Sequence, residues 1–434
     1  MLNLMRRFAA TLSLLGLLLV VMTTTCLVLK KIDNYKPQAR GMVLGLYAND
    51  PKFNYGEALR RMASLGVQAA SLQFIYFMDE FSSLEIKPHP VNTPTDENLR
   101  RTIRQARSLG MRVMIFPTIN IRDEAQNEKY WRGNIEPKDW NPWWNNYEKF
   151  NLHFAQIAQD EGAEWYSVGT EMESSQRFKE NWIRIIQSVR EVFKGKITYS
   201  VNFDAQDSFD FGEALDVIGM NTYDPISKDK EFPSRETIYQ HWWWILYKAR
   251  TLEVRFNKPV MITEIGYASS ESAHRDPWDF RSPSPPYPER QAILMEEALN
   301  VLQHWTEGEA IFYYLYGEDL KLGLRPGGPL DTSFSPLGKP TEEILRYFFS
   351  MPRWNYEFWI GRYPVPSSAK NYAMNQTVLS NLRRLKTGTL QVLPPWILFW
   401  SQKHPETFKS LEEQVKKESL EKIKEGLPKL SDTK

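Results

Sequence analysis

From Met42 onward, short apolar runs alternate with longer segments in which apolar residues recur every three or four positions. The short runs are typical of buried strands, and the longer segments are typical of amphipathic helices. Strands that alternate with helices favour βα units and a parallel sheet. The pattern predicts eight strands, at residues 42–48, 67–77, 111–119, 163–171, 196–203, 215–223, 260–264 and 310–316.

Helical patterns fill most of the gaps between these strands, and the fifth gap is the exception. Its only helical candidate is short, around residues 211–215. Eight strands with intervening helices form a (β/α)8 (TIM) barrel, an α/β fold that commonly takes about 250 residues or more. We therefore expect one barrel domain over residues 32–350 of the 434-residue chain. Longer helices are predicted at residues 96–109, 143–161, 176–193, 235–256 and 288–305.

Two of the predicted strands end in a glutamate. The run at 260–262 is apolar at every position, as expected for a strand covered on both faces, and Glu264 follows it. Glu171 has the same place at the end of the fourth strand, and counting alternate residues puts the small Gly169 and Ser167 on its face. Barrels of this kind carry their chemistry at the carboxyl ends of the strands. Two carboxylates brought together there are the pair that glycoside hydrolysis uses.

The sequence around these glutamates resembles that of clan A glycoside hydrolases, and most closely that of glycoside hydrolase family 113, which includes β-mannanases. The resemblance covers roughly residues 42–349. Clan A enzymes usually have Asn before the acid/base glutamate, whereas this chain has Thr170, as family 113-like sequences often do. The motifs that carry the resemblance are WRGNIEP at 131–137, GTEMES at 169–174, ITEIGY at 262–267 and SPLGKP at 335–340.

The resemblance implies a retaining mechanism, in which Glu264 is the nucleophile and Glu171 is the acid/base. Retention requires the two carboxyl groups to lie about 5 to 5.5 Å apart. Tyr223, at the end of the sixth strand, matches the aromatic hydroxyl that positions the nucleophile in clan A. Glu173 is expected farther out than Glu171, where it would orient a substrate hydroxyl or cap the next helix.

A long stretch after the third strand, residues 120–144, holds four tryptophans beside polar side chains. Sugar rings have apolar faces edged by hydroxyls, so flat aromatic rings with polar neighbours suit them. We expect at least two of the four indoles to pack against the barrel instead. The predicted substrate-binding residues are Asn120, Trp131, Arg132, Trp143, Glu173, Asn202, Asn221, Tyr223 and Tyr316. In contrast, the run at 242–244 of three tryptophans is expected to pack, because consecutive helical positions point about 100° apart.

The first 31 residues have the composition of a membrane segment. Arg6 and Arg7 precede an uncharged run of 22 residues, 8–29, and about 20 apolar residues can cross a bilayer. No small-x-small cleavage site follows, so an uncleaved signal anchor is expected. Basic residues flank both ends of the run, so the expected placement of the barrel outside the cytoplasm, periplasmic or extracellular, rests on the polysaccharide-type site. Cys26, the only cysteine, excludes an intrachain disulfide and is read as a lipid-facing thiol rather than a lipidation site.

Composition narrows the classes of partner. With 42% hydrophobic and 13% aromatic residues the chain is folded over most of its length, and 54 basic against 53 acidic residues give no basis for binding nucleic acid. The six histidines show no metal-ligand spacing, and no phosphate-binding glycine motif follows a strand. We therefore expect no metal and no cofactor.

Beyond residue 350 the strand–helix alternation stops, and residues 351–434 form a C-terminal extension whose role the sequence leaves open. The apolar stretch at 393–400 is too short to cross a bilayer. Residues 406–425 predict an amphipathic helix. This extension is a candidate contact for an envelope protein partner.

These observations predict an anchored, retaining glycoside hydrolase that acts on a β-linked polysaccharide, either mannan-like or an exopolysaccharide of the cell envelope. The alternative is a non-catalytic carbohydrate-binding or scaffold protein of an envelope polysaccharide machine. The anchor and the C-terminal extension favour the alternative. The pair of strand-end carboxylates opposes it, because a groove that only binds sugar has no need of them.

Overall fold

The computed structural model describes residues 38–122, 131–279, 284–303, 305, 308–317, 327–350 and 404–426, together with a few positions between 375 and 401. The chain separates into two compact units, Met1–Gln38 and Ala39–Lys434. The predicted anchor, residues 1–31, lies outside the described residues. Within the described ranges, none of the helices is both long enough and apolar enough to cross a bilayer.

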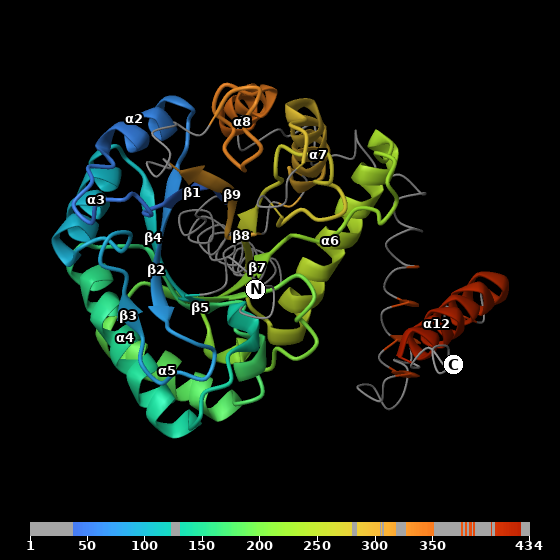
Figure 1. Ribbon diagram of the computed structural model, residues 1–434, viewed down its shortest axis with the longest axis horizontal. Coiled ribbons are helices and arrows are strands. Elements are labelled where there is room, and N and C mark those ends of the chain that lie inside the picture. The colour runs from blue at the N-terminus through green and yellow to red at the C-terminus, as the bar shows by residue number, and fades with distance from the viewer. Residues whose placement is uncertain are drawn as a thin grey trace, which may run out of the picture. The chain divides into compact units, whose positions relative to one another are not determined.

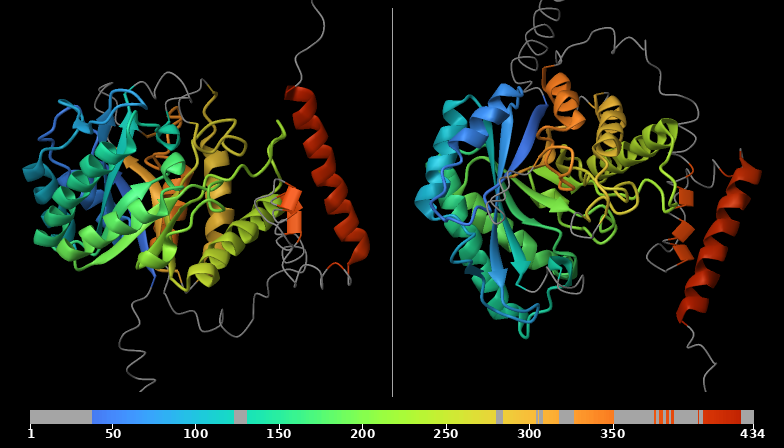
Figure 2. Two further views of the ribbon diagram at one scale, coloured as in Figure 1. Left: turned by 90° about the horizontal axis from the view of Figure 1, so that it is seen from below. Right: turned by 45° about the horizontal axis from the view of Figure 1, so that its top comes forward.

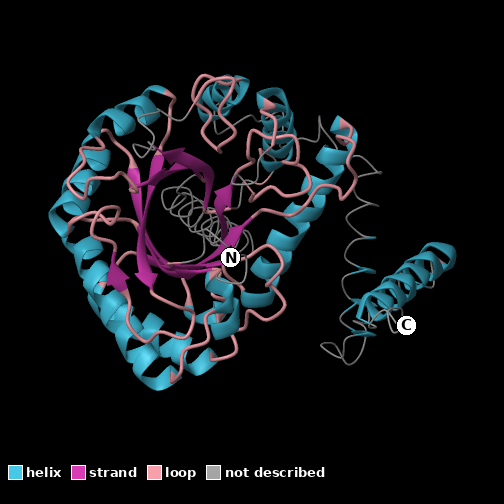
Figure 3. Cartoon of the chain, viewed as in Figure 1, coloured by secondary structure: helices cyan, strands magenta, loops and turns pink. Residues whose placement is uncertain are grey.

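Eight parallel strands close into a barrel, because β1 pairs with β2 on one side and with β9 on the other (Figures 1 and 3). All eight predicted strands are found, and each overlaps its expected range. A two-residue strand, β3 (Lys87–Pro88), adds an antiparallel edge to β2. The barrel strands are β1 (Ala39–Gly45), β2 (Ala69–Met78), β4 (Arg112–Ile121), β5 (Trp165–Thr170), β6 (Lys196–Val201), β7 (Val217–Asn221), β8 (Val260–Ile265) and β9 (Ala310–Gly317).

Helices cover the outside of the strands, as the views in Figures 1 and 2 show. The fifth connection is the exception, as predicted, since it holds only the 3-10 helix η4 (Gly212–Ala214). Capping fixes some helix starts: the Thr95 and Ser234 hydroxyls accept from backbone N–H groups in the first turns of α3 and α6. The helices around the barrel are α2 (Gly56–Ser64), α3 (Asp96–Ser108), α4 (Trp140–Asp160), α5 (Lys179–Val192), α6 (Arg235–Phe256), α7 (Pro288–Leu302) and α8 (Pro340–Ser350).

The core has an inner and an outer apolar layer. Inside the barrel, buried side chains such as Met114, Trp165 and Phe312 form one cluster. A larger cluster fills the space between the strands and the helices, and Trp143 and Trp144 of α4 belong to it. The expectation that at least two of the four indoles pack against the barrel is therefore confirmed. The same burial removes Trp143 from the predicted substrate surface, since its indole N–H points to the sulfur of Met78 at 3.4 Å.

Three barrel strands carry an irregularity near their carboxyl ends. Ser167 of β5 pairs with Thr198 of β6, and Thr170 pairs with Ser200, so β5 has one more residue than β6 between the two pairs. In β8 an extra residue lies between Ile262 and Ile265, and in β9 between Tyr313 and Tyr316. Such bulges shift the side chains that follow them from one face of the strand to the other.

The bulge in β5 overturns the simple alternation expected beside Glu171. A Cβ atom placed on Gly169 would lie 2.7 Å from the Tyr147 hydroxyl of α4 and 2.9 Å from the Trp182 ring of α5. Gly169 therefore faces the outer layer instead of the barrel interior. Its lack of a side chain makes room for aromatic rings of the helices and not for a ligand.

The C-terminal extension contains α12 (Pro405–Gly426), which confirms the predicted helix. Leu411 and Val415 of α12 are buried in a small apolar cluster of their own with Val378, Leu379 and Leu382. The apolar stretch 393–400 lies outside the described residues.

Candidate active site

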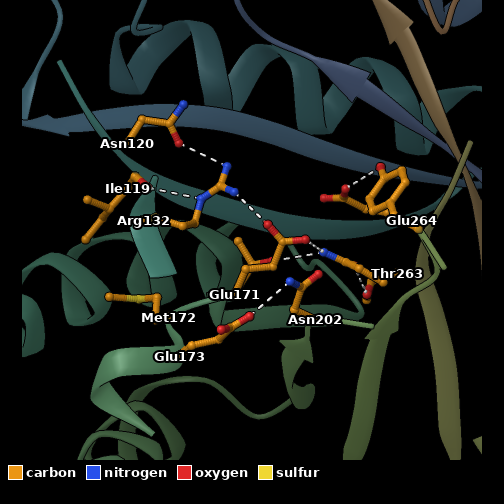
Figure 4. Close-up of polar contacts among 12 residues, drawn as sticks. Ile119, Asn120, Arg132, Glu171, Met172, Glu173, Asn202, Thr263 and Glu264 are labelled. Carbon is orange, nitrogen blue, oxygen red and sulfur yellow. Dashed lines mark hydrogen bonds and ion pairs between the residues drawn. The ribbon is translucent and has the colours of Figure 1, made fainter. Parts of the chain in front are cut away.

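Glu171 and Glu264 lie at the carboxyl ends of β5 and β8, where the barrel pattern predicts them (Figure 4). Both are largely buried, with 7% and 6% of their surface exposed. Glu171 has a left-handed backbone, with φ of 51°, and its N–H donates to the Ser200 carbonyl at 2.9 Å. The backbone turns sharply at this residue as it leaves the strand.

Two neutral donors hold the Glu264 carboxylate. The Tyr223 hydroxyl donates to Oε2 at 2.7 Å, and the Gln73 amide donates to Oε1 at 2.9 Å. The Tyr47 hydroxyl donates to the side-chain oxygen Oε1 of Gln73, which fixes the orientation of the Gln73 side-chain amide. Tyr223 thus makes the contact that the clan resemblance implies. Tyr47 has no strong sequence signal beyond its place two residues after β1.

Glu171 is held by one cation and one amide. Arg132 Nη1 donates to Oε2 at 2.7 Å, and Asn221 Nδ2 donates to Oε1 at 2.7 Å. Asn221 is itself fixed, because the Thr263 hydroxyl donates to its Oδ1 at 2.7 Å. Arg132 Nη2 also donates to Asn120 Oδ1 at 3.0 Å, as Figure 4 shows. The predicted residues Asn120, Arg132 and Asn221 therefore meet at Glu171.

The two carboxyl groups interact electrostatically. Burial first, and then the negative charge of Glu171, raise the pKa of Glu264 to about 8. The two carboxyl groups therefore resist carrying two negative charges at once. When one carboxylate attacks and the other carboxyl group donates a proton, the pair must hold one proton in total. That proton has to be on the proton-donating group when substrate is bound.

Glu173 and Asn202 lie together beside Glu171 (Figure 4). Asn202 Nδ2 donates to Glu173 Oε1 at 3.0 Å and to Asp204 Oδ1 at 2.8 Å. Burial raises the pKa of Glu173 to about 7, with Asp204 and Glu171 adding to the rise. Glu173 opens the 3-10 helix η3 (Glu173–Ser175) and is more exposed than Glu171.

The remaining predicted residues divide between the site and the core. Trp131 is half-buried and stands directly before Arg132, and its ring lies over Gly133 of the short helix η2 (Arg132–Asn134). Tyr316 is wholly buried in the outer layer, where it contacts Arg61 of α2. The structure therefore corrects the placement of Tyr316 at the site.

The bulge in β9 explains this correction, because it turns Tyr316 outward. Tyr314 takes the inward place. Its ring packs edge-on against Tyr223, with 6.1 Å between the ring centroids. Strict alternation from Phe312 would have placed both tyrosines inside the barrel.

This constellation can carry out proton transfer and nucleophilic attack with protein groups alone. In the parts of the chain that the structure describes, no three His, Cys, Asp or Glu side chains gather in a metal-binding arrangement. The two fixed carboxylates, one beside neutral donors and the other beside a cation, are instead suited to two different roles.

Comparisons with known proteins agree with this fold. The solved β-mannanase of family 113 from Alicyclobacillus acidocaldarius, in complex with ManMIm, is 24% identical; the match covers 73% of this chain and 98% of that one, with a TM-score of 0.63. A second family 113 β-1,4-mannanase is 22% identical over 73% of this chain and all of its own, with a TM-score of 0.64. A family 5 mannosidase from Rhizomucor miehei is 12% identical over 73% of this chain and 93% of its own, with a TM-score of 0.52. At these identities the solved structures show a shared fold.

Sequence comparison identifies the family. Among curated proteins, none matches the chain. The sequence model of Glycoside Hydrolase Family 113, however, matches residues 45–318, which include both strand-end glutamates and every predicted site residue. This match spans well over half of the 434 residues, and the chain therefore belongs to glycoside hydrolase family 113.

Proposed function

We propose that this protein hydrolyses a β-linked, mannan-like polysaccharide with retention of configuration. The observation that carries the proposal is the pair of buried glutamates at the carboxyl ends of β5 and β8, each held by two donors. The likeness to solved β-mannanases supports the substrate class. A protein that only binds sugar has no use for such a pair, so the non-catalytic alternative loses its support.

In the first step, ionised Glu264 attacks the anomeric carbon, and the bond from that carbon to the departing oxygen breaks. Glu171 gives its proton to that oxygen, so the leaving sugar departs as a neutral alcohol. Tyr223 and Gln73 keep the attacking carboxylate aimed while it changes from anion to ester. The product is a glycosyl ester on Glu264.

In the second step, Glu171 acts as a carboxylate and takes a proton from water. The water oxygen attacks the anomeric carbon, the ester bond breaks, and Glu264 leaves with its electron pair. Arg132 supports this step because its guanidinium stabilises a negative charge on Glu171. Two displacements at one carbon restore the starting configuration.

The charges around the site favour a neutral substrate. Three carboxyl groups, those of Glu171, Glu264 and Glu173, face each other across the rim with Arg132 as the cation that contacts Glu171. An anionic polysaccharide would compete with Glu171 for Arg132 and would be repelled by these carboxyl groups as they ionise. A neutral mannan meets only hydrogen-bonding groups and aromatic rings.

A trapping experiment tests the mechanism. A 2-deoxy-2-fluoro glycosyl fluoride should inactivate the enzyme and leave its sugar on Glu264, as found by mass spectrometry of the digest. Nuclear magnetic resonance of the first product should show the configuration of the substrate. A sugar attached to another residue, or an inverted first product, would contradict the proposal. Activity on a panel of mannans, glucans and bacterial exopolysaccharides identifies the sugar.

We further propose that residues 1–31 anchor the protein in a membrane, with the barrel in the periplasm or outside the cell. The uncharged run of 22 residues supports this proposal, as does a substrate found outside the cytoplasm. The extension after residue 350, with its own apolar cluster on α12, is proposed as the contact for an envelope protein partner.

A further inference from the structure

A stacked pair of aromatic rings lies on the rim of the barrel and has no part in holding either glutamate. The rings of Phe203 and Trp278 are 5.5 Å apart between centroids and are inclined by only 15°. Trp278 is 41% exposed, which is unusual for the largest apolar side chain. One face of its indole rests on Phe203, so a planar surface remains open to solvent.

This aromatic pair belongs to the catalytic end of the barrel. Phe203 follows β6, and Trp278 lies in the segment between β8 and α7, so both lie at the carboxyl ends of strands. Phe203 comes directly after Asn202, whose amide donates to Glu173. Phe203 is thus the neighbour in sequence of a residue that contacts Glu173.

A buried ion pair holds this part of the rim in place. Lys248 Nζ donates to the Phe203 carbonyl at 2.8 Å and also pairs with Asp224. Asp224 follows Tyr223, which binds Glu264. The backbone of Phe203 is therefore tied to the segment that positions the nucleophile.

The residues on the two sides of the site differ in how much of their surface is exposed to solvent. Gln73 and Tyr223, which hold Glu264, are buried, whereas Glu173 is half-buried and Asp204 is exposed. Glu171 protonates the oxygen of the leaving sugar, so the part of the polysaccharide that departs must extend along this more open side. Phe203 and Trp278 are on that side, next to Asn202.

We propose that the Phe203–Trp278 pair binds a neutral hexopyranose ring in the leaving part of the polysaccharide. The apolar face of the sugar stacks on the open face of Trp278, and its hydroxyl groups donate to the carboxyl groups of Glu173 and Asp204. This inference rests on the proposed function and deepens it. It gives the enzyme a binding place beyond the cleaved bond.

Substrates with and without a leaving sugar separate this role from a structural one. An aryl glycoside has no sugar on the leaving side. The variant Trp278→Ala should therefore lose about five- to twentyfold in kcat/KM on manno-oligosaccharides and at most about twofold on an aryl mannoside. Transfer of the sugar to added manno-oligosaccharide acceptors should fall in parallel, because the acceptor occupies the same place. Trp278→Phe should recover part of the loss.

Tyr347→Ala is the matched control, since Tyr347 is 66% exposed on α8 and remote from the rim in sequence and topology. Tyr347→Ala should leave kcat/KM unchanged on both substrates. Equal losses on both substrates for Trp278→Ala, or no loss on the oligosaccharide, would overturn the inference while leaving the trapped Glu264 ester intact. Absence of that ester in the wild type would instead refute the proposed function.

Binding provides a second measurement that needs no turnover. In the Glu264→Ala background, titration calorimetry with manno-oligosaccharides should show about tenfold weaker binding when Trp278→Ala is added. Unchanged binding would also overturn the inference.

Discussion

Each oxygen of Glu171 and Glu264 accepts a hydrogen bond from a different side chain, so neither carboxyl group has an oxygen without a donor in the free enzyme. A general acid must carry a proton on one oxygen and aim it at the leaving group. Asn221 is fully buried and fixed by Thr263, whereas the Arg132 side chain is 15% exposed. Arg132 is therefore the partner that has to move when substrate binds, and its return favours the anion that activates water.

Arg132→Met should slow hydrolysis of the glycosyl ester more than its formation, by about tenfold, because only the second step uses anionic Glu171. With a dinitrophenyl glycoside the ester should accumulate, and stopped-flow absorbance should show a burst of phenolate. Arg132→Lys keeps the charge and should show a smaller burst. Equal slowing of both steps would show that Arg132 has no separate role in the second step.

Glu171 and Glu173 can be told apart by the leaving group. Glu171→Ala should reduce activity on mannan by roughly a thousandfold or more but keep much of ester formation from an aryl glycoside whose phenolate leaves unaided. Glu173→Ala should reduce activity on mannan by only about tenfold and leave the aryl glycoside nearly unchanged, because Glu173 is proposed to bind the leaving sugar and not to give it a proton. Steady-state and single-turnover rates on the two substrates make the comparison. The reverse pattern would assign the acid/base role to Glu173.

The raised pKa of Glu264 makes this residue costly to the fold at neutral pH. Between its usual pKa of about 4.5 and the folded value of about 8, the unfolded chain releases a proton that the folded enzyme keeps. Stability from this group is therefore complete below about pH 4.5 and is lost as pH rises to about 8.

Glu264→Gln removes this dependence. Its Tm should exceed that of the wild type by at least about 3 °C at pH 8, with a smaller difference at pH 5. Differential scanning calorimetry over this range makes the measurement. A constant difference across the range would show that Glu264 does not titrate as described.

At the scale of the elements, the hydrophobic pattern predicts all eight strands and the short fifth connection, because burial sets both periodicities. It also places both glutamates at strand ends. It misplaces Tyr316 and Gly169, since a bulge adds one residue to a strand without changing its composition. Trp143 fails for another reason: the helix predicted at residues 143–161 begins at this residue, but nothing in the sequence shows that its first turn is buried in the outer layer.

Gly169→Ala tests the bulge in β5. The added methyl group would meet the Tyr147 hydroxyl at 2.7 Å, and that hydroxyl is held by the Val168 carbonyl. We expect a loss of about 1 to 3 kcal/mol in the free energy of unfolding, measured with denaturant, together with lower activity through Glu171. The control is Gly317→Ala at the end of β9, where the nearest atom is 3.7 Å away, with an expected change within about 0.5 kcal/mol. Similar losses in both variants would contradict the account of β5.

At the scale of the whole molecule, the sequence predicts the barrel region well because its motifs recur in a family, and the family match covers residues 45–318. The terminal segments lie outside that match, so only their own composition predicts their roles. The near balance of 54 basic and 53 acidic residues suits a protein whose proposed substrate is neutral.

A chain that begins at Asp33 should keep full activity on mannan and remain in the supernatant after ultracentrifugation, whereas the full chain should sediment with membranes. Leu18→Arg, which puts a charge in the middle of the uncharged run, should shift the full chain toward the supernatant without altering activity. Fractionation followed by immunoblotting makes the comparison. Full-length, unprocessed protein in the soluble fraction would refute the proposed anchor.

The left-handed backbone at Glu171 lowers the stability of the fold at a residue that the proposed mechanism requires. A φ of 51° costs a residue with a side chain about 1 kcal/mol that glycine avoids. Selection for heat resistance alone would therefore favour glycine at the position of the proton donor. We expect glycine at this position in relatives that have the same barrel but do not hydrolyse sugar. Laboratory evolution for a higher Tm would have to select for activity in every round, because selection for stability alone favours the loss of Glu171.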